Sequence, residues 1–177
     1  VLEDKDGETE IRIDVNSVME LKDYLSKKNI YMKRQSTAIG EFVRLNWDAV
    51  TAAGETVTTN YSSIKVAKGN LVGVLFGNAN FETPQQVVVS FESNEEADGT
   101  SLDDKVYLLV YCPDADAAIL SAPVKRSANS VSVLVPGYWG GMTVHLWGFT
   151  QGDGMTNVGD NRGKISNSTY IGSGTIG

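Results

Sequence analysis

The chain has 177 residues, of which 41% are hydrophobic, enough for one domain with a buried core. Its formal net charge of −7, from 22 Asp and Glu against 15 Lys and Arg, argues against binding to nucleic acid or to anionic lipid. A single Cys and a single His exclude an internal disulfide, zinc sites made of several thiolates and His-rich metal sites. No apolar stretch approaches the roughly 18–20 residues of a membrane span.

The N-terminal segment is acidic and polar. Residues 1–4 resemble neither a signal peptide nor a natural start, so we expect a processed or truncated product. The alternation in Ile11–Val15 predicts a short strand. Ser17 and Glu20 have the spacing of a capping box, and apolar residues at helical spacing follow, which predicts a helix over Ser17–Lys28.

A second helix is expected from Ser36 or Thr37 to Ala52, because apolar residues recur on one face and Gly54 can end it. Asn46 falls within this apolar stripe. Its amide is expected at the edge of the stripe or buried and hydrogen-bonded to neighbouring backbone, rather than binding a ligand. Residues 1–53 are therefore expected to form a lead-in segment, an arm with a strand and two helices that serves assembly.

From Glu55 onward the period changes to two, which predicts a β-sandwich domain over residues 54–177. The fold class expected is mainly β, an antiparallel immunoglobulin-like sandwich preceded by a short strand and two helices. Both faces of Lys105–Cys112 are apolar, which predicts a central strand, whereas Ser130–Val135 has one face richer in Val and is expected nearer an edge or a wet face. The candidate strands are Thr56–Asn60, Ile64–Ala67, Leu71–Phe76, Gln86–Glu92, Lys105–Cys112, Ala117–Ala122, Ser130–Val135, Met142–Thr150 and Lys164–Ile171.

The two residues most often used in nucleophilic catalysis both fall inside predicted strands. His145 is expected to be a packed or cross-strand residue, and Cys112 a small core side chain, because no basic neighbour or helix start is evident to activate its thiol. A pair of carboxylates for glycoside hydrolysis could be assembled from many acidic residues, so that pattern is unspecific. We therefore expect no enzyme activity and no cofactor.

The loops offer weak binding candidates. Asp153, Asn157, Asp160 and Asn161, in the long loop 152–163, could supply oxygen ligands to calcium, with Asp153 and Asp160 as the candidate metal ligands, but their spacing does not match an EF-hand. Asp114 and Asp116 form a second such group, although acidic Gly-rich loops are usually solvated turns.

Tyr138 and Trp139 lie between glycines and form the one plausible aromatic platform on a loop. Such a pair could stack on a sugar or on a partner protein. It could equally fold back over the end of the sandwich core, and we favour this second interpretation.

Several short motifs occur in order along the chain: Phe42–Val50, Asn60–Leu71, Asp104–Pro113, Arg126-Ser-Ala, Trp147-Gly-Phe and Ser166–Gly172. Taken together, they resemble a family of uncharacterised proteins, a domain of unknown function common in Bacteroidota and among the structural genes or prophage regions of their phages. The resemblance covers residues 36–177 and implies an immunoglobulin-like sandwich behind a helical lead-in, with no catalytic residues to transfer.

The function expected from these observations is that of a non-enzymatic structural protein, a head- or tail-associated component of a phage virion. Its partners would be itself or other virion proteins, bound through the N-terminal arm, sheet edges and loops. The alternative is a secreted or cell-surface glycan-binding or adhesive module that uses Tyr138, Trp139 and the loop 152–163.

Overall fold

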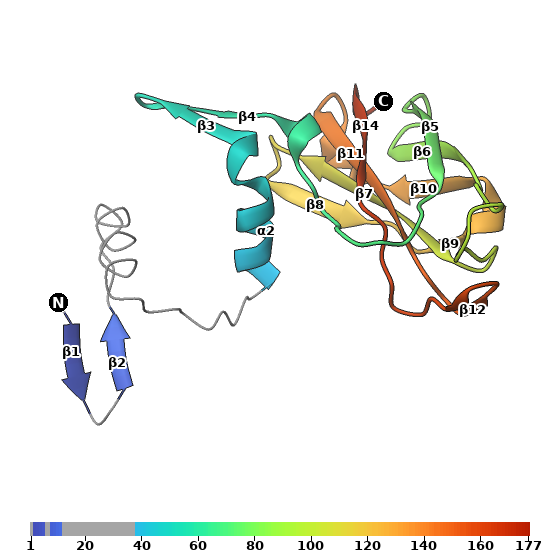
Figure 1. The fold of residues 1–177 in the computed structure, drawn as a ribbon. Helices are drawn as coiled ribbons and strands as arrows, with labels where there is room; N and C mark the ends of the chain where they lie inside the picture. The colour runs from blue at the N-terminus through green and yellow to red at the C-terminus, as the bar shows by residue number, and fades with distance from the viewer. Residues whose placement is uncertain (1, 6–7, 12–37) are drawn as a thin grey trace. The chain divides into compact units, whose positions relative to one another are not determined.

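The computed structural model describes residues 2–5, 8–11 and 38–177 of the chain (Figure 1). The chain divides into two compact units, residues 1–37 and 38–177, whereas the sequence placed the boundary after residue 53. In the first unit, β1 (Leu2–Lys5) pairs antiparallel with β2 (Glu8–Ile11). The helix predicted at Ser17–Lys28 lies outside the described residues, and so does all of the predicted strand Ile11–Val15 except its first residue.

The second unit begins with the one α-helix of the described residues, α2 (Ala38–Asn46). This helix ends well before Ala52, so its predicted length is wrong. A 3₁₀ turn, η2 (Trp47–Ala49), follows, and then β3 (Val50–Ala53) pairs with β4 (Thr56–Thr59). The β-branched Val and Thr residues of these two segments favour strands. Gly54, which was expected to end the helix, instead takes the first position of the two-residue hairpin turn, with a φ of 62°.

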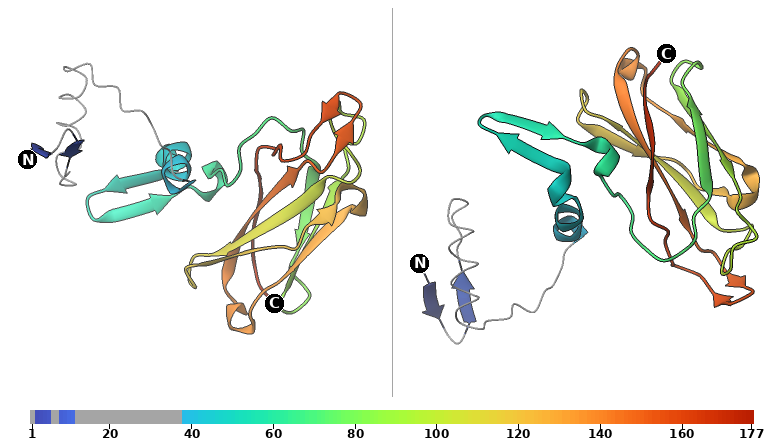
Figure 2. Two further views of the ribbon diagram at one scale, coloured as in Figure 1. Left: turned by 90° about the horizontal axis from the view of Figure 1, so that it is seen from below. Right: turned by 45° about the horizontal axis from the view of Figure 1, so that its top comes forward.

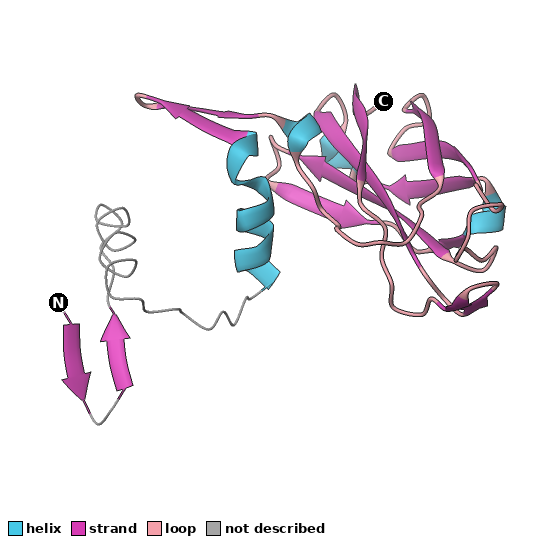
Figure 3. Ribbon diagram, in the orientation of Figure 1, coloured by secondary structure: helices cyan, strands magenta, loops and turns pink. Residues whose placement is uncertain are grey.

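The body of this unit consists of two larger antiparallel sheets that face each other (Figures 2 and 3). The three-stranded sheet has the order β10-β6-β5, and the larger sheet has the order β14-β11-β7-β8, with β9 also paired to β7. The short strands β12 and β13 form a separate pair. Four 3₁₀ turns lie in the described part of the unit: η2, η3 (Tyr61–Ser63), η4 (Arg126–Ala128) and η5 (Gly137–Trp139). The strands are β5 (Leu75–Asn80), β6 (Gln86–Glu92), β7 (Lys105–Cys112), β8 (Ala117–Leu120), β9 (Val124–Lys125), β10 (Ser130–Leu134), β11 (Thr143–Gln151), β12 (Met155–Thr156), β13 (Gly159–Asp160) and β14 (Thr169–Thr175).

The core lies between these two sheets because alternate residues of their strands point toward one another. Its central members are Val87 and Val89 of β6, Leu108 and Val110 of β7 and Leu146 of β11, all fully buried. The prediction of a mainly β chain with antiparallel sheets is confirmed. None of the helices in the described part of the chain has the length and hydropathy that crossing a membrane requires.

The strand predictions hold best where side chains alternate strictly. Gln86–Glu92 and Lys105–Cys112 match β6 and β7 at both ends, β7 is central in its sheet, and Ser130–Leu134 lies at a sheet edge as expected. The segment 64–67 is not a strand, and the strands predicted at 71–76 and 164–171 lie further along the chain, as β5 and β14. Leu71 and Ile165 form only isolated bridges, to Ser166 and Gln151, and Ile64 accepts a single hydrogen bond from the Trp147 side chain, so none of these segments is paired along its length as a strand would be.

The two sheets approach closely where Gly148 of β11 faces the Phe76 ring of β5. A Cβ on Gly148, in β11, would lie 2.1 Å from Cζ of Phe76 in the opposite sheet. That distance is far below van der Waals contact, so the Phe76 ring occupies the space that any larger residue at 148 would need.

Candidate functional site

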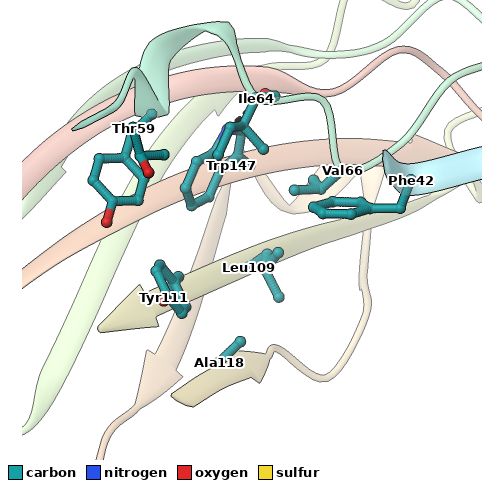
Figure 4. A pocket seen from close by; sticks show the side chains of 9 residues that line it. Phe42, Thr59, Ile64, Val66, Leu109, Tyr111, Ala118 and Trp147 are labelled. Carbon is teal, nitrogen blue, oxygen red and sulfur yellow. Dashed lines mark hydrogen bonds between the residues drawn. The ribbon is translucent and has the colours of Figure 1, made fainter. Parts of the chain in front are cut away.

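An apolar groove lies on the outer face of the larger sheet, away from the core. Its floor is formed by β7, β8 and β11, and its other side by α2, the end of β4 and the segment that follows β4 (Figure 4). Its volume is about 360 Å³, within the range of small-ligand pockets, which runs from about 300 to 1,000 Å³. The lining residues are Phe42, Thr59, Tyr61, Ile64, Val66, Leu109, Tyr111, Ala118 and Trp147.

Aromatic residues hold the segment after β4 against the sheet. The Nε1–H of Trp147 donates a hydrogen bond to the carbonyl of Ile64 at 3.0 Å. The Tyr61 ring stacks on the His145 imidazole with the ring centroids 3.8 Å apart, and His145 Nδ1 and the Tyr170 hydroxyl are 2.9 Å apart. These contacts fix one wall of the groove in place.

His145 is therefore a cross-strand packing residue, as the sequence suggested. Burial lowers the pKa of its imidazole below the usual value, which keeps the ring neutral at neutral pH. Cys112 of β7 is fully buried on the core side of the larger sheet, with its Sγ 3.7 Å from the Sδ of Met142.

Asn46 fixes the end of α2 onto the segment that follows β4. Its Nδ2 donates to the carbonyls of Phe42 and Lys65, both at 2.9 Å, and its Oδ1 accepts the Lys65 N–H at 2.6 Å. Asn46 is buried, so the prediction of a hydrogen-bonded structural amide is confirmed. These bonds hold the backbone at Lys65 against the last turn of the helix.

Most of the apolar side chains of α2 are exposed. Ile39 is 77% exposed, Trp47 in η2 is 72% exposed, and Phe42 and Val43 are also exposed. The hairpin β3–β4 continues this pattern, since Val50 and Val57 are exposed. We call these six side chains the apolar surface.

The candidate residues of the loop 152–163 are engaged in structural contacts. Asp153 forms a 2.9 Å ion pair with Lys105, and Asn157 Nδ2 donates to Asp98. Asp160 binds Arg162 with a shortest distance of 2.6 Å, and the Arg162 guanidinium and backbone N–H lower the pKa of Asp160 to about 2.

Asn161 is buried, and so it cannot serve a ligand at the surface. Its Nδ2 donates to Asp104 at 2.8 Å and to the carbonyl of Gly99 at 3.1 Å, and its Oδ1 accepts the Gly154 N–H. The described residues contain no group of three or more His, Cys, Asp or Glu side chains that could hold a metal ion.

The aromatic pair at the end of the sandwich is split between core and surface. Trp139 is fully buried in the core cluster, whereas Tyr138 is 66% exposed. A buried indole cannot stack on a sugar, so the two rings do not form a platform. Trp139 covers the end of the core, which matches the interpretation that we favoured.

Sequence reasoning missed a buried ion pair. Arg126 and Asp104 both have fully buried side chains, with Arg126 Nη2 3.2 Å from Asp104 Oδ2. The remaining guanidinium donors reach the carbonyls of Ser93 at 2.6 Å and Val72 at 2.7 Å. Burial lowers the pKa of Arg126, and the contact with Asp104 opposes that shift. Both residues stand next to exposed charges in the sequence, so no local pattern signals their burial.

Comparison with known proteins identifies a family to which no function is assigned. No curated protein and no solved structure matches the chain. The model of a family of unknown function, DUF6266, matches residues 19–172. Because this match covers most of the chain, the protein belongs to that family, as the motifs suggested.

Proposed function

We propose that the protein is a non-enzymatic structural protein that assembles into a larger particle, a phage virion. The observation that carries this proposal is the apolar surface of α2 and the hairpin β3–β4, which leaves large aliphatic and aromatic side chains in water. These side chains lie on four consecutive elements, α2, η2, β3 and β4, and large exposed apolar patches on a folded domain usually mark contacts with a partner.

The remaining side chains support a structural role. The lone His is used in a stacked pair, the lone Cys is buried, and the acidic residues of the long loop bind neighbouring cations or backbone. The assignment to a virion rests on the resemblance of the sequence motifs to a family found among phage structural genes.

We also propose that the two-sheet body is immunoglobulin-like. The orders β5-β6-β10 and β14-β11-β7-β8 correspond to the A-B-E and G-F-C-C′ sheets of such sandwiches. Folds of this class present edges and loops to partners, which suits an assembly protein, although the fold does not itself define a function.

The glycan-binding alternative is less well supported because Trp139 is buried and meets Tyr138 edge-on, so only the Tyr138 ring is exposed for stacking on a sugar. A glycan array probed with the purified chain would test it directly. Binding that is lost in Tyr138→Ala would favour this alternative over assembly.

The assembly proposal is tested on particles purified from bacteria that carry the gene. Mass spectrometry of the purified particles should identify this chain, and electron microscopy should place it at a regular position. Absence of the chain from purified virions, together with discrete monomers by electron microscopy of the isolated protein, would refute the proposal.

A further inference from the structure

The hairpin β3–β4 has an apolar face that is left in water. Every residue of β3 and the first three of β4 are exposed. Pairing places Val50 opposite Thr59 and Ala52 opposite Val57, so these four side chains share one face. Val57 is 67% exposed and Val50 is 47% exposed. A two-stranded hairpin alone is at best marginally stable in water, so this hairpin gains from further pairing.

The same face continues into the apolar groove, because Thr59 also lines that groove. The eight strand residues of the hairpin carry no charge. Natural proteins protect an exposed strand edge with charges or Pro, and this hairpin has neither in its strands. The turn lies at the end that points away from the two sheets (Figures 1 and 2).

A complementary edge lies on the other side of the groove. β8 pairs with β7 along one edge, and no strand in the described residues pairs with its other edge. Its four residues are also uncharged. Ala118 lines the groove and Leu120 is 50% exposed, and both lie on the outer face because they stand opposite Tyr111 and Leu109 of β7.

We propose that one strand of the hairpin β3–β4 of one copy adds to the edge of β8 in a second copy. The two edges match in length, four residues or about 13 Å each, and neither brings a charge that pairing would bury. The apolar face of the hairpin then lies beside Ala118 and Leu120 and extends the apolar outer face of the larger sheet, which forms the floor of the groove.

A second copy is the partner because one chain carries both halves of the contact. Its own hairpin extends away from β8, so the pairing takes place between chains (Figure 1). The donor and acceptor surfaces differ, so the contact is head to tail and builds rings or filaments. This inference rests on the proposed assembly function and identifies its contact.

The test compares the full-length chain with two variants by sedimentation velocity over a wide range of concentrations. The wild-type chain should form oligomers, and Val57→Lys should weaken association by roughly tenfold or more, because a Lys opposes edge pairing. The control is Leu134→Lys on β10, which is 75% exposed at an edge of the other sheet and should associate like the wild type. Circular dichroism checks that both variants fold.

Disulfide cross-linking identifies the contact independently. A mixture of the Val57→Cys and Leu120→Cys proteins should form a mixed dimer on oxidation. In the control, a mixture of the Val57→Cys and Leu134→Cys proteins should not. The native Cys112 is buried and does not compete. A wild-type chain that stays monomeric, or a Val57→Lys variant that associates normally, would overturn this inference. Detection of the chain in purified virions would still support the proposed function in that case.

Discussion

Replacing Arg126 with Met removes the positive half of a fully buried ion pair and keeps most of the apolar side chain. Arg126 donates to the Asp104 carboxylate and to the carbonyls of Ser93 and Val72. Without the guanidinium, Asp104 keeps the N–H donors of Ser101 and the Asn161 amide but loses its charge partner. The two carbonyls lose the side-chain donor that reaches them.

The cost follows from the burial of both side chains, each 0% exposed. Removing one partner of a buried ion pair typically costs about 3–5 kcal/mol, because a charge is left in a poorly solvated place. For a domain of this size each kcal/mol shifts the melting temperature by about 2–4 °C, so a fall of roughly 6–20 °C is expected. Natural domains have only about 5–15 kcal/mol in total, so partial unfolding is a possible outcome at the upper end.

The neighbouring pair supplies a matched control. Lys125 binds Asp103 at 2.7 Å with both side chains more than 60% exposed, so solvent screens this pair and Lys125→Met should leave the stability nearly unchanged. Urea denaturation followed by circular dichroism measures both variants. Equal destabilisation by Arg126→Met and Lys125→Met, or a cost below about 1 kcal/mol for Arg126→Met, would refute the reasoning.

Three further predictions follow from local geometry. Gly148→Ala should destabilise the fold by about 1–3 kcal/mol in urea denaturation, because its Cβ would meet an aromatic ring, whereas Gly154→Ala, with nothing within 4 Å, should be nearly neutral. The carboxyl of Asp160 should titrate by NMR near pH 2 and return toward its ordinary value in Arg162→Ala, and the stabilisation that this pair contributes should be lost as the pH falls from about 4 toward 2. Burial should keep the pKa of His145 below its ordinary value of 6.5, so the unfolded state binds a proton more readily and the folded state should lose stability as the pH falls below that value. A His145→Gln variant whose stability has the same pH dependence as that of the wild type would contradict this.

The sheets could be predicted from sequence where the side-chain pattern is set by two-sided burial. Lys105–Cys112 alternates between core residues and outward residues such as Tyr107 and Tyr111, and the strand is bounded by acidic and Pro-containing turns, so its limits were clear. The same reasoning placed Ser130–Val135 nearer an edge or a wet face, because one of its faces is richer in Val, and β10 lies at a sheet edge.

The region around α2 and β3 was predicted wrongly, because two local patterns compete there. Apolar spacing favours a helix through to Ala52, whereas Val50 and Thr51 followed by Gly54 favour a hairpin. The contact of Asn46 with Lys65, distant in sequence, decides between them. The hairpin signal of two β-branched runs around a Gly-containing two-residue turn was present and could have been used.

The loop candidates failed for a different reason. Oxygen-bearing side chains in a Gly-rich loop look alike in sequence whether they bind an ion, solvent or the protein itself. Here Asn161 points inward because the buried Asp104 accepts a hydrogen bond from its amide, and that requirement comes from a residue far away in the chain. The aromatic pair shows the same limit, since only the packing of the core decides that Trp139 is buried and Tyr138 exposed.

The buried polar side chains and the exposed apolar side chains of this unit both bear on its proposed role in assembly. Asp104, Arg126 and Asn161 are buried polar side chains bound to one another or to backbone, so they stabilise the loops at one end of the body and leave little capacity for a ligand. The groups that would gain most from a partner are apolar, namely the side chains of α2 and the hairpin β3–β4. A surface of this kind lowers its free energy by association and offers no chemistry, because aliphatic side chains and Thr hydroxyls neither transfer protons at neutral pH nor bind metals well. The same argument predicts that charge placed on the hairpin weakens assembly while leaving the stability of the body unchanged.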